Sequence, residues 1–416
     1  MSYIGLLDCN NFFVSCERLF RPDLKYRPVV VLSSNDGCVI ARSKEIKDIG
    51  IAMGVPYFQI KDTLREINAV TFSTHFALYR DISKRVFEVV REHFDTVEQY
   101  SIDECFFTFD SDNPKETLLE LKSKVEQAVG IPVSLGAASS KTRAKYVNGI
   151  AKKTTGVAVW GEEEWIAQTP DISMYEIWGV GKGRMDQFKK HGLKTIADFC
   201  TLESRVVSKL FGVEGSRLHA ELNGISVDSV KRASVAQKSI MNTRSFANTT
   251  TDTEVLRDAL LYHLHQGVKD LESMGLLVQN LRVLILPSRH GDYMLQGSSK
   301  DYSFAATKDL FALEQVVIRL LSECYRPGVP YKKAGIILSN LVPSGGQTES
   351  LFPEDNKTQN TKVVSEALFA INKKHGADTL QLGRLTSSSP AWEVKKELSS
   401  PAYTTNWSQL KTVLAK

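Results

Sequence analysis

Acidic residues inside two strongly apolar segments constrain this chain more than any other feature. Residues 3–7 predict a buried strand that ends at Asp8, and residues 100–107 predict a second strand with Asp103 and Glu104 in its middle. Charged side chains in such segments are costly unless they are paired or bound to metal. Three carboxylates converging from two neighbouring strands would form an oxygen site suited to Mg²⁺, and two such ions can clamp the oxygens of a phosphoryl transfer.

Length and composition predict a soluble protein of several domains. With 416 residues, two to four domains are expected, and 42% hydrophobic with 24% charged residues is typical of globular proteins. No apolar stretch approaches the ~20 residues of a membrane span, and the N-terminus lacks a secretory signal. The six cysteines include no CxxC pair, which favours reduced thiols in a cytosolic compartment over a zinc site.

A basic region with clustered glycines indicates contact with a polyanion. Residues 176–244 contain twelve Lys or Arg against seven Asp or Glu, although an ordinary solvated surface fits these counts equally well. Glycines let a backbone approach closely, and a helix N-terminus offers free N–H groups to phosphate. A glycine turn between packed helices is the alternative, but the adjacent cations favour a helix-hairpin-helix on the DNA backbone. Its predicted contacts are Gly179, Gly181, Lys182, Arg184, Lys189 and Lys190.

The remaining patterns predict a multidomain α+β protein. The first part should contain a sheet with helices on one face. Its expected strands include residues 27–32 and 132–137, and its expected helices residues 10–20, 39–50, 76–94 and 114–129. The later part should follow a β-α-β-β-α-β order, with strands at 240–246, 276–287, 293–296 and 334–341 and helices at 253–274 and 310–325. The polar tail should be extended or mobile, with one helix at 362–374.

Several motifs carry a resemblance to a known family. Residues 8–13, 28–31, 37–42 and 100–104 occur in one order and spacing that resembles the Y-family, lesion-bypass DNA polymerases. Residues 35–42, 140–145, 331–335 and 400–405 are most similar to the UmuC branch, the catalytic subunit of bacterial DNA polymerase V. The resemblance covers nearly the whole chain and implies a right-hand polymerase. The implied parts are palm 1–20 and 74–165, small fingers 21–73, helical thumb 166–228, linker 229–239, little finger 240–342 and C-terminal tail 343–416.

The resemblance also implies the parts of an active site. Asp8, Asp103 and Glu104 match the catalytic carboxylates, with the Cys9 carbonyl as an added ligand of two Mg²⁺ ions. Phe13 matches the aromatic steric gate that excludes a ribose 2′-hydroxyl, whereas Phe12 should pack in the core. The implied ligands of the incoming dNTP are Lys47 and Lys152 on the triphosphate, with Lys44 at a position that varies among relatives. Cys38 would lie beneath the templating base.

The implied function is error-prone, template-directed DNA synthesis past damaged bases in the SOS response, at the bacterial nucleoid. The implied partners are primer-template DNA, a cleaved UmuD dimer, the RecA filament and the sliding clamp. Gln347, Leu351 and Phe352 resemble a clamp-binding peptide with one extra residue before the Leu-Phe anchor; a surface Leu-Phe without function is the alternative. Three other functions remain open: a self-sufficient polymerase of the DinB branch, a non-catalytic DNA-binding subunit and a nucleotide cyclase.

Overall fold

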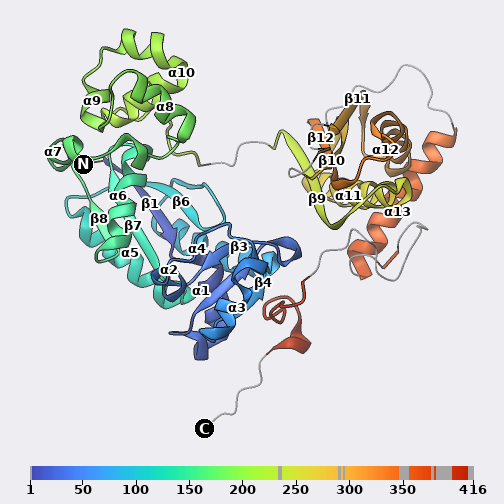
Figure 1. Ribbon diagram of the computed structural model, residues 1–416, viewed down its shortest axis with the longest axis horizontal. Coiled ribbons are helices and arrows are strands. Elements are labelled where there is room, and N and C mark those ends of the chain that lie inside the picture. Colours follow the sequence, from blue (N-terminus) through green and yellow to red (C-terminus); the bar gives the residue numbers. More distant parts are fainter. Residues whose placement is uncertain are drawn as a thin grey trace. The chain divides into compact units, whose positions relative to one another are not determined.

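The chain folds into two compact units. The computed structural model describes residues 2–232, 237–288, 292–293, 296–345, 356–375, 379–380 and 396–410. The large unit comprises Met1–Ser234 together with Lys396–Lys416, and the small unit comprises Val235–Lys395 (Figure 1). Among the described residues, no helix is both long and apolar enough to cross a membrane.

The central sheet of the large unit is built around its first strand. The strand order is β5-β6-β1-β7-β8, and only the β7–β8 pair is parallel. β1 is buried on both faces, because Ile4 and Leu6 pack on one side and Leu7 and Cys9 on the other. The strands are β1 (Ser2–Cys9), β5 (Val97–Gln99), β6 (Glu104–Asp110), β7 (Val133–Ala138) and β8 (Val157–Val159).

Helices cover both faces of this sheet, so the prediction of helices on one face was wrong. The main core joins the sheet to α1, α4 and α5, whereas Ala144 and Val147 of α6 pack with Ile4 and Leu6 on the opposite face. An apolar run such as β1 is what a strand covered on both faces requires. These helices are α1 (Phe12–Phe20), α4 (Phe76–His93), α5 (Pro114–Val129) and α6 (Lys141–Lys153).

A second, three-stranded sheet lies between α1 and α4 in the sequence. Its order is β3-β2-β4, from β2 (Val29–Leu32), β3 (Val39–Arg42) and β4 (Val70–Ser73). The predicted helix at residues 39–50 was wrong, because β-branched Val39 and Ile40 lie in β3 beside β2 and only α2 (Lys44–Asp48) is helical. The helix α3 (Tyr57–Glu66) contributes Leu64 to a separate small core.

The remaining helices of the large unit form a small bundle with its own core. They are α7 (Glu162–Gln168), α8 (Lys182–Lys190), α9 (Ile196–Cys200) and α10 (Ser204–Leu222). Phe188, Phe199 and Leu222 are fully buried in this bundle. The glycine-rich turn before α8 contains Gly179 at φ +81°, a left-handed conformation that glycine adopts without strain.

The small unit has the predicted β-α-β-β-α-β order. Its elements are β9 (Ser239–Thr250), α11 (Thr253–Met274), β10 (Leu276–Pro287), β11 (Ser298–Thr307), α12 (Leu310–Cys324) and β12 (Tyr331–Pro343), with sheet order β11-β10-β12-β9. Of the predicted strand at 293–296, residues 294 and 295 lie outside the described residues, and residues 293 and 296 are not in a strand. The strand that follows α11 and β10 is β11, a largely exposed edge strand whose sequence lacks the apolar alternation that marks a half-buried strand.

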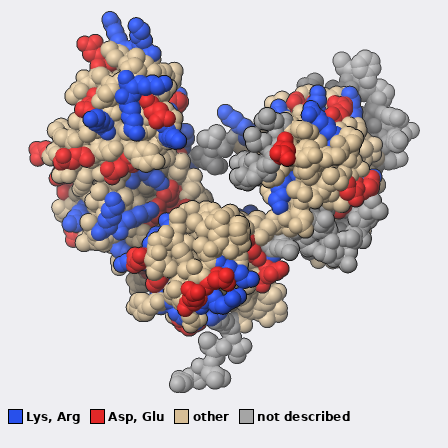
Figure 2. Space-filling model, viewed as in Figure 1, with Lys and Arg blue, Asp and Glu red and all other residues tan. Residues whose placement is uncertain are grey.

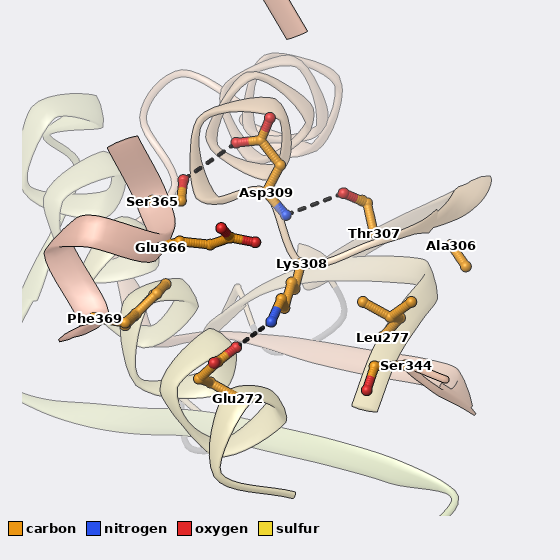
Figure 3. Close-up of a pocket in the computed structure, with 10 residues that line it drawn as sticks. All are labelled: Glu272, Leu277, Ala306, Thr307, Lys308, Asp309, Ser344, Ser365, Glu366 and Phe369. Carbon is orange, nitrogen blue, oxygen red and sulfur yellow. Dashed lines mark hydrogen bonds and ion pairs between the residues drawn. The ribbon is translucent and has the colours of Figure 1, made fainter. Parts of the chain in front are cut away.

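A further helix, α13 (Asn356–His375), packs against the small unit. Leu368 is buried, and Phe369 packs on the core of this unit. Figure 3 shows Ser365 of α13 facing Asp309, which also caps the first turn of α12 through the Phe311 amide at 3.0 Å. The Thr361 hydroxyl donates to the other Asp309 oxygen at 2.7 Å, so α13 is docked by polar and apolar contacts.

The end of the chain returns to the large unit. Residues 396–410 contact the three-stranded sheet and α1, and Tyr403 joins the main core of the large unit. For these residues the prediction of an extended or mobile tail was wrong, because Tyr403 supplies an aromatic anchor that composition alone does not reveal.

Candidate active site

Two of the predicted carboxylates meet across neighbouring strands. Asp8 near the end of β1 lies opposite Glu104 at the start of β6. The predicted strand at residues 100–107 was wrong at its beginning, because residues 100–103 form the turn between β5 and β6. The amides of Tyr100 and Ser101 both donate to the Glu104 carbonyl, at 3.0 and 3.1 Å, which closes this turn. Asp103 therefore lies on a turn beside the strand pair.

Asp8 is held in a buried, charge-paired environment. Its side chain is 8% exposed, and Lys152 Nζ donates to Asp8 Oδ2 at 2.5 Å. Burial, followed by a hydrogen bond with Glu104, raises the pKa of Asp8 to about 7, although the positive charge of Lys152 opposes this shift. A buried carboxylate of this kind gains from any cation that approaches it.

Glu104 has a lysine partner that the sequence interpretation missed. Lys145 Nζ donates to both carboxylate oxygens of Glu104. Burial alone would raise the pKa of Glu104, but hydrogen bonds with Asp8 and Lys145 lower it below its usual value. Sequence spacing offered a signal, because Lys145 and Lys152 are seven residues apart and so share one face of α6.

The third carboxylate lies beside this pair without joining it. Ser101 Oγ donates to Asp103 Oδ1 at 2.5 Å, while the Asp103 carbonyl accepts from the Cys9 amide at 2.9 Å. Among the described residues, no three His, Cys, Asp or Glu side chains are close enough together to hold a metal ion. The donors available are nonetheless hard oxygens, because burial raises the pKa of the Cys9 thiol and keeps it protonated. This set fits magnesium in its chemistry.

Close packing positions the helix that carries both lysines. Asn148 lies between them on α6, and its Nδ2 donates to the carbonyls of Leu6 at 3.1 Å and Ser134 at 2.8 Å. A Cβ at Gly136 of β7 would lie 2.2 Å from the Asn148 amide nitrogen. Glycine at this position therefore allows α6 to approach the sheet closely enough for its lysines to reach the carboxylates.

Phe13, in the first turn of α1, belongs to an aromatic cluster. Its ring stacks on Tyr79 with centroids 4.5 Å apart and planes 15° apart, and Phe76 meets both rings edge-on. Phe13 is half-buried, whereas its neighbour Phe12 is almost fully buried in the main core. Of the two, Phe13 is therefore the ring available to a ligand.

The predicted triphosphate ligands differ in their surroundings. Lys47 Nζ donates to Asn11 Oδ1, and burial together with the positive charges of Arg42 and Lys152 lowers the pKa of Lys47. Lys47 therefore lies near two further cations, of which Arg42 is one to which the sequence interpretation gave no role. Lys44, the first residue of α2, is exposed.

The predicted DNA-binding residues lie at both ends of α8. Gly181 is the N-cap, Lys182 begins the helix and Lys189 and Lys190 end it. Arg184 donates to the Gly179 carbonyl at 3.4 Å, and within the described ranges these four cations form no ion pair. Figure 2 shows Lys and Arg side chains on this face of the α8–α10 region, at the top of the view. The predicted clamp residues Gln347, Leu351 and Phe352 lie outside the described residues.

Comparison with family models identifies three segments. Residues 7–149 match the impB/mucB/samB family, and residues 237–351 match the C-terminal domain of that family. The first match contains the paired carboxylates, and the second covers most of the small unit. Residues 364–413 match a domain of unknown function, DUF4113.

Full-length relatives agree with this assignment. Protein UmuC of Salmonella typhimurium is 32% identical over 98% of this chain and 99% of its own length, and protein SamB of the same organism is 32% identical over 98% of both. DNA polymerase IV 1 of Halalkalibacterium halodurans is 29% identical over 91% of this chain and 92% of its own length.

Solved structures share the fold. A Y-family DNA polymerase chimera of Dbh and Dpo4 matches with a TM-score of 0.67 and 19% identity over 82% of this chain and 99% of the other. DinB from Sulfolobus solfataricus matches with a TM-score of 0.52 and 20% identity over the same shares. Carboxylates paired across two strands, lysines presented by one helix and near-complete coverage by UmuC-like relatives lead to one assignment: this chain belongs to the impB/mucB/samB family, the UmuC branch of the Y-family DNA polymerases.

Proposed function

We propose that Asp8, Asp103 and Glu104, with the Cys9 carbonyl, hold two Mg²⁺ ions with which this error-prone translesion DNA polymerase extends a primer. The observation that carries this proposal is the cross-strand pairing of Asp8 with Glu104, each neutralised by its own lysine. Buried like charges at one strand end are costly, and a cation-binding role explains why they are placed there.

The chemistry divides between the metals and the protein. When bound, two such ions would lower the pKa of the primer 3′-hydroxyl and neutralise the developing charge on the leaving pyrophosphate. The carboxylates orient this centre from the rigid sheet. Lys47 and Lys152 supply cations for the triphosphate of the incoming dNTP, with Lys44 as a further contact. Positioning and charge neutralisation are the main requirements of phosphoryl transfer.

Phe13 would select the sugar of the incoming nucleotide. Its ring is fixed by stacking on Tyr79, so it cannot withdraw easily from a 2′-hydroxyl placed against it. A rigid aromatic ring at this place would admit a deoxyribose and collide with a ribose.

The large unit would contain palm, fingers and thumb, and the small unit the little finger. The sheet that bears the carboxylates would be the palm, the three-stranded sheet the fingers and the α8–α10 bundle the thumb. Gly179, Gly181 and the cations of α8 would hold the phosphates of primer-template DNA, since exposed cations at a helix N-terminus with free amides suit a polyanion.

The UmuC relationship favours a polymerase that acts at the bacterial nucleoid with a cleaved UmuD dimer, a RecA filament and the sliding clamp. The clamp contact would use Leu351 and Phe352 as apolar anchors, with Gln347 contributing less because of the added residue. A self-sufficient polymerase of the DinB branch differs in needing no accessory protein. Primer extension across an abasic template, with and without UmuD and RecA, therefore separates the two branches.

The decisive experiment replaces the carboxylates one at a time. Asp103→Ala and Glu104→Ala should each abolish single-nucleotide addition, because each substitution removes a metal ligand together with the negative charge that attracts the metal. DNA affinity measured in the same preparations should change little, since neither residue is among the cations and glycines proposed to hold the DNA phosphates. Near-normal extension by both variants would refute the proposed metal site.

A further inference from the structure

The end of the domain of unknown function is docked on the large unit. We call residues 396–410 the C-terminal strap; they lie within the matched stretch 364–413. The Ser73 amide at the end of β4 donates to the Leu398 carbonyl, and the Leu398 amide donates to Ser73 Oγ, both at 3.0 Å. One backbone hydrogen bond and one side-chain hydrogen bond therefore hold the strap at the end of β4.

Two side chains anchor the strap in the interior. Tyr403 is 4% exposed and stacks on Phe20 of α1 with ring centroids 4.6 Å apart and planes 7° apart. Ser400 is 8% exposed and points at the same helix. Trp407 of the strap is by contrast 89% exposed, so the buried contacts belong to particular residues and not to the segment as a whole.

Ser400 binds a buried carboxylate on α1. Its hydroxyl donates to Glu17 Oε1 at 3.1 Å, and the Tyr79 hydroxyl donates to the same oxygen at 2.7 Å. Glu17 is fully buried, and within the described residues its Oε2 has no hydrogen-bond partner. Because the single hydroxyl hydrogen of Ser400 goes to Glu17, His75 Nδ1 at 3.1 Å must be the donor to Ser400. These contacts fix the orientation of the Glu17 carboxylate.

Glu17 in turn fixes the ring on which Phe13 rests. Tyr79 is bound through its hydroxyl to Glu17 and through its face to Phe13. A continuous series of contacts thus runs from Ser400 through Glu17 and Tyr79 to Phe13. In the low dielectric of the interior, the hydrogen bonds of such a series are stronger than they would be in water.

We propose that the C-terminal strap positions the sugar gate, with Ser400 and Glu17 as positioning residues that set how strictly ribonucleotides are rejected. This inference rests on the proposed role of Phe13 and assigns the domain of unknown function a part in substrate selection. Without the Ser400 hydroxyl, the Glu17 carboxylate is held by the Tyr79 hydroxyl alone and can rotate. The Tyr79 ring is then held less firmly, so the Phe13 ring that stacks on it can move away from a 2′-hydroxyl.

The test measures sugar selectivity in the full-length chain. The quantity is the ratio of kcat/KM for dCTP to that for CTP opposite template guanine, with Phe13→Ala as the reference for a lost gate. Ser400→Ala should lower this ratio about tenfold, the effect of about 1.4 kcal/mol expected from one hydrogen bond to a carboxylate. Ser400→Thr retains the hydroxyl and should keep the parental ratio. Trp407→Ala, in the same strap but exposed, is the matched control and should leave it unchanged.

The outcomes separate the inference from the proposed function. A lower ratio in both Phe13→Ala and Ser400→Ala supports the inference. A lower ratio in Phe13→Ala alone, with Ser400→Ala merely less stable to heat, shows that the strap only stabilises the fold and overturns the inference. An unchanged ratio in Phe13→Ala overturns the gate and this inference together, yet the carboxylate proposal still stands on its own variants.

A second variant tests the inference if Ser400→Ala folds poorly. Glu17→Gln keeps one acceptor oxygen and the side-chain volume while removing the charge, so it should fold with the strap in place but hold the Tyr79 hydroxyl less strongly. Hydrogen exchange of the α4 amides around Tyr79 should then rise together with the loss of selectivity. Exchange at parental rates with parental selectivity in Glu17→Gln would also overturn the inference.

Discussion

Arg143 joins the central sheet of the large unit to its helical bundle, and its replacement by lysine should be severe. The buried guanidinium forms five hydrogen bonds, two to the Leu222 carbonyl, one to Ser139 Oγ and two to the Glu162 carboxylate. It also lies 4.8 Å from the centre of the Trp165 ring. Arg143→Lys keeps the charge but loses the planar fork, so only about two of these contacts can survive.

The expected loss follows from the contacts removed. Three hydrogen bonds at about 1 kcal/mol each give about 3 kcal/mol, to which the weakened contact with the Trp165 ring adds about 0.5 kcal/mol. For a unit of this size, each kcal/mol lowers the melting temperature by about 2–4 °C, so a fall of roughly 7–14 °C is expected.

The assay is denaturant unfolding followed by tryptophan fluorescence, since Trp165 lies in the contact itself. Arg217→Lys is the matched control, because Arg217 forms one ion pair with Glu214 in which both side chains are more than 60% exposed. That variant should lose less than about 0.5 kcal/mol. If Arg143→Lys is no more destabilised than this control, the guanidinium does not hold the two parts together and the reasoning is refuted.

Three further predictions concern other parts of the chain. Replacing both Lys182 and Arg184 with Ala should reduce the slope of log DNA affinity against log salt by about two, and an unchanged slope would place α8 away from DNA. Burial, then Arg244, lowers the pKa of buried His263 to about 4. The unfolded chain therefore binds a proton that the folded chain does not, and acid unfolding should show the small unit losing up to about 3 kcal/mol as pH falls from 6.5 to 4, a loss absent in His263→Gln. A peptide carrying Leu351 and Phe352 should bind the sliding clamp in a titration, and equal binding after both become Ala would refute that contact.

The elements with strong periodicity were predicted well. Helices α4, α5 and α11 and strand β10 lie where the apolar pattern placed them, within a residue or two. The pattern failed where pairing decides the structure. Residues 39–42 were joined to the helix that follows them, but β-branched Val39 and Ile40 favour a strand and β2 offers them a partner. The polar edge strand β11 was predicted at earlier residues for the same reason. Its position depends on pairing with β10 and not on its own side chains.

The candidate site was predicted in part. The register of β1 and β6 confirms that Asp8 and Glu104 are neighbours, as expected from two strands that each carry an acid. The Glu104 partner Lys145 was missed, because a lysine on a periodic element is usually solvated and sequence does not show which carboxylate it faces. The docking of residues 396–410 was missed as well, since contacts such as Ser400 with Glu17 join residues far apart in the chain.

The two lysines of α6 explain how a polymerase can keep its acids buried before substrates arrive. Lys152 pairs with Asp8 yet its own side chain remains 41% exposed, whereas Lys145 is 22% exposed beside Glu104. A half-exposed amine stays partly hydrated while it exchanges a carboxylate for a phosphate. For a more buried amine the same exchange has a higher free-energy cost. We therefore expect that Lys152 would be free to pair with the triphosphate if Asp8 held a metal ion, while Lys145 stays with Glu104. The helix α6, which approaches the sheet closely at Gly136, would then have two roles: its lysines pair with the carboxylates in the free protein, and Lys152 binds the nucleotide.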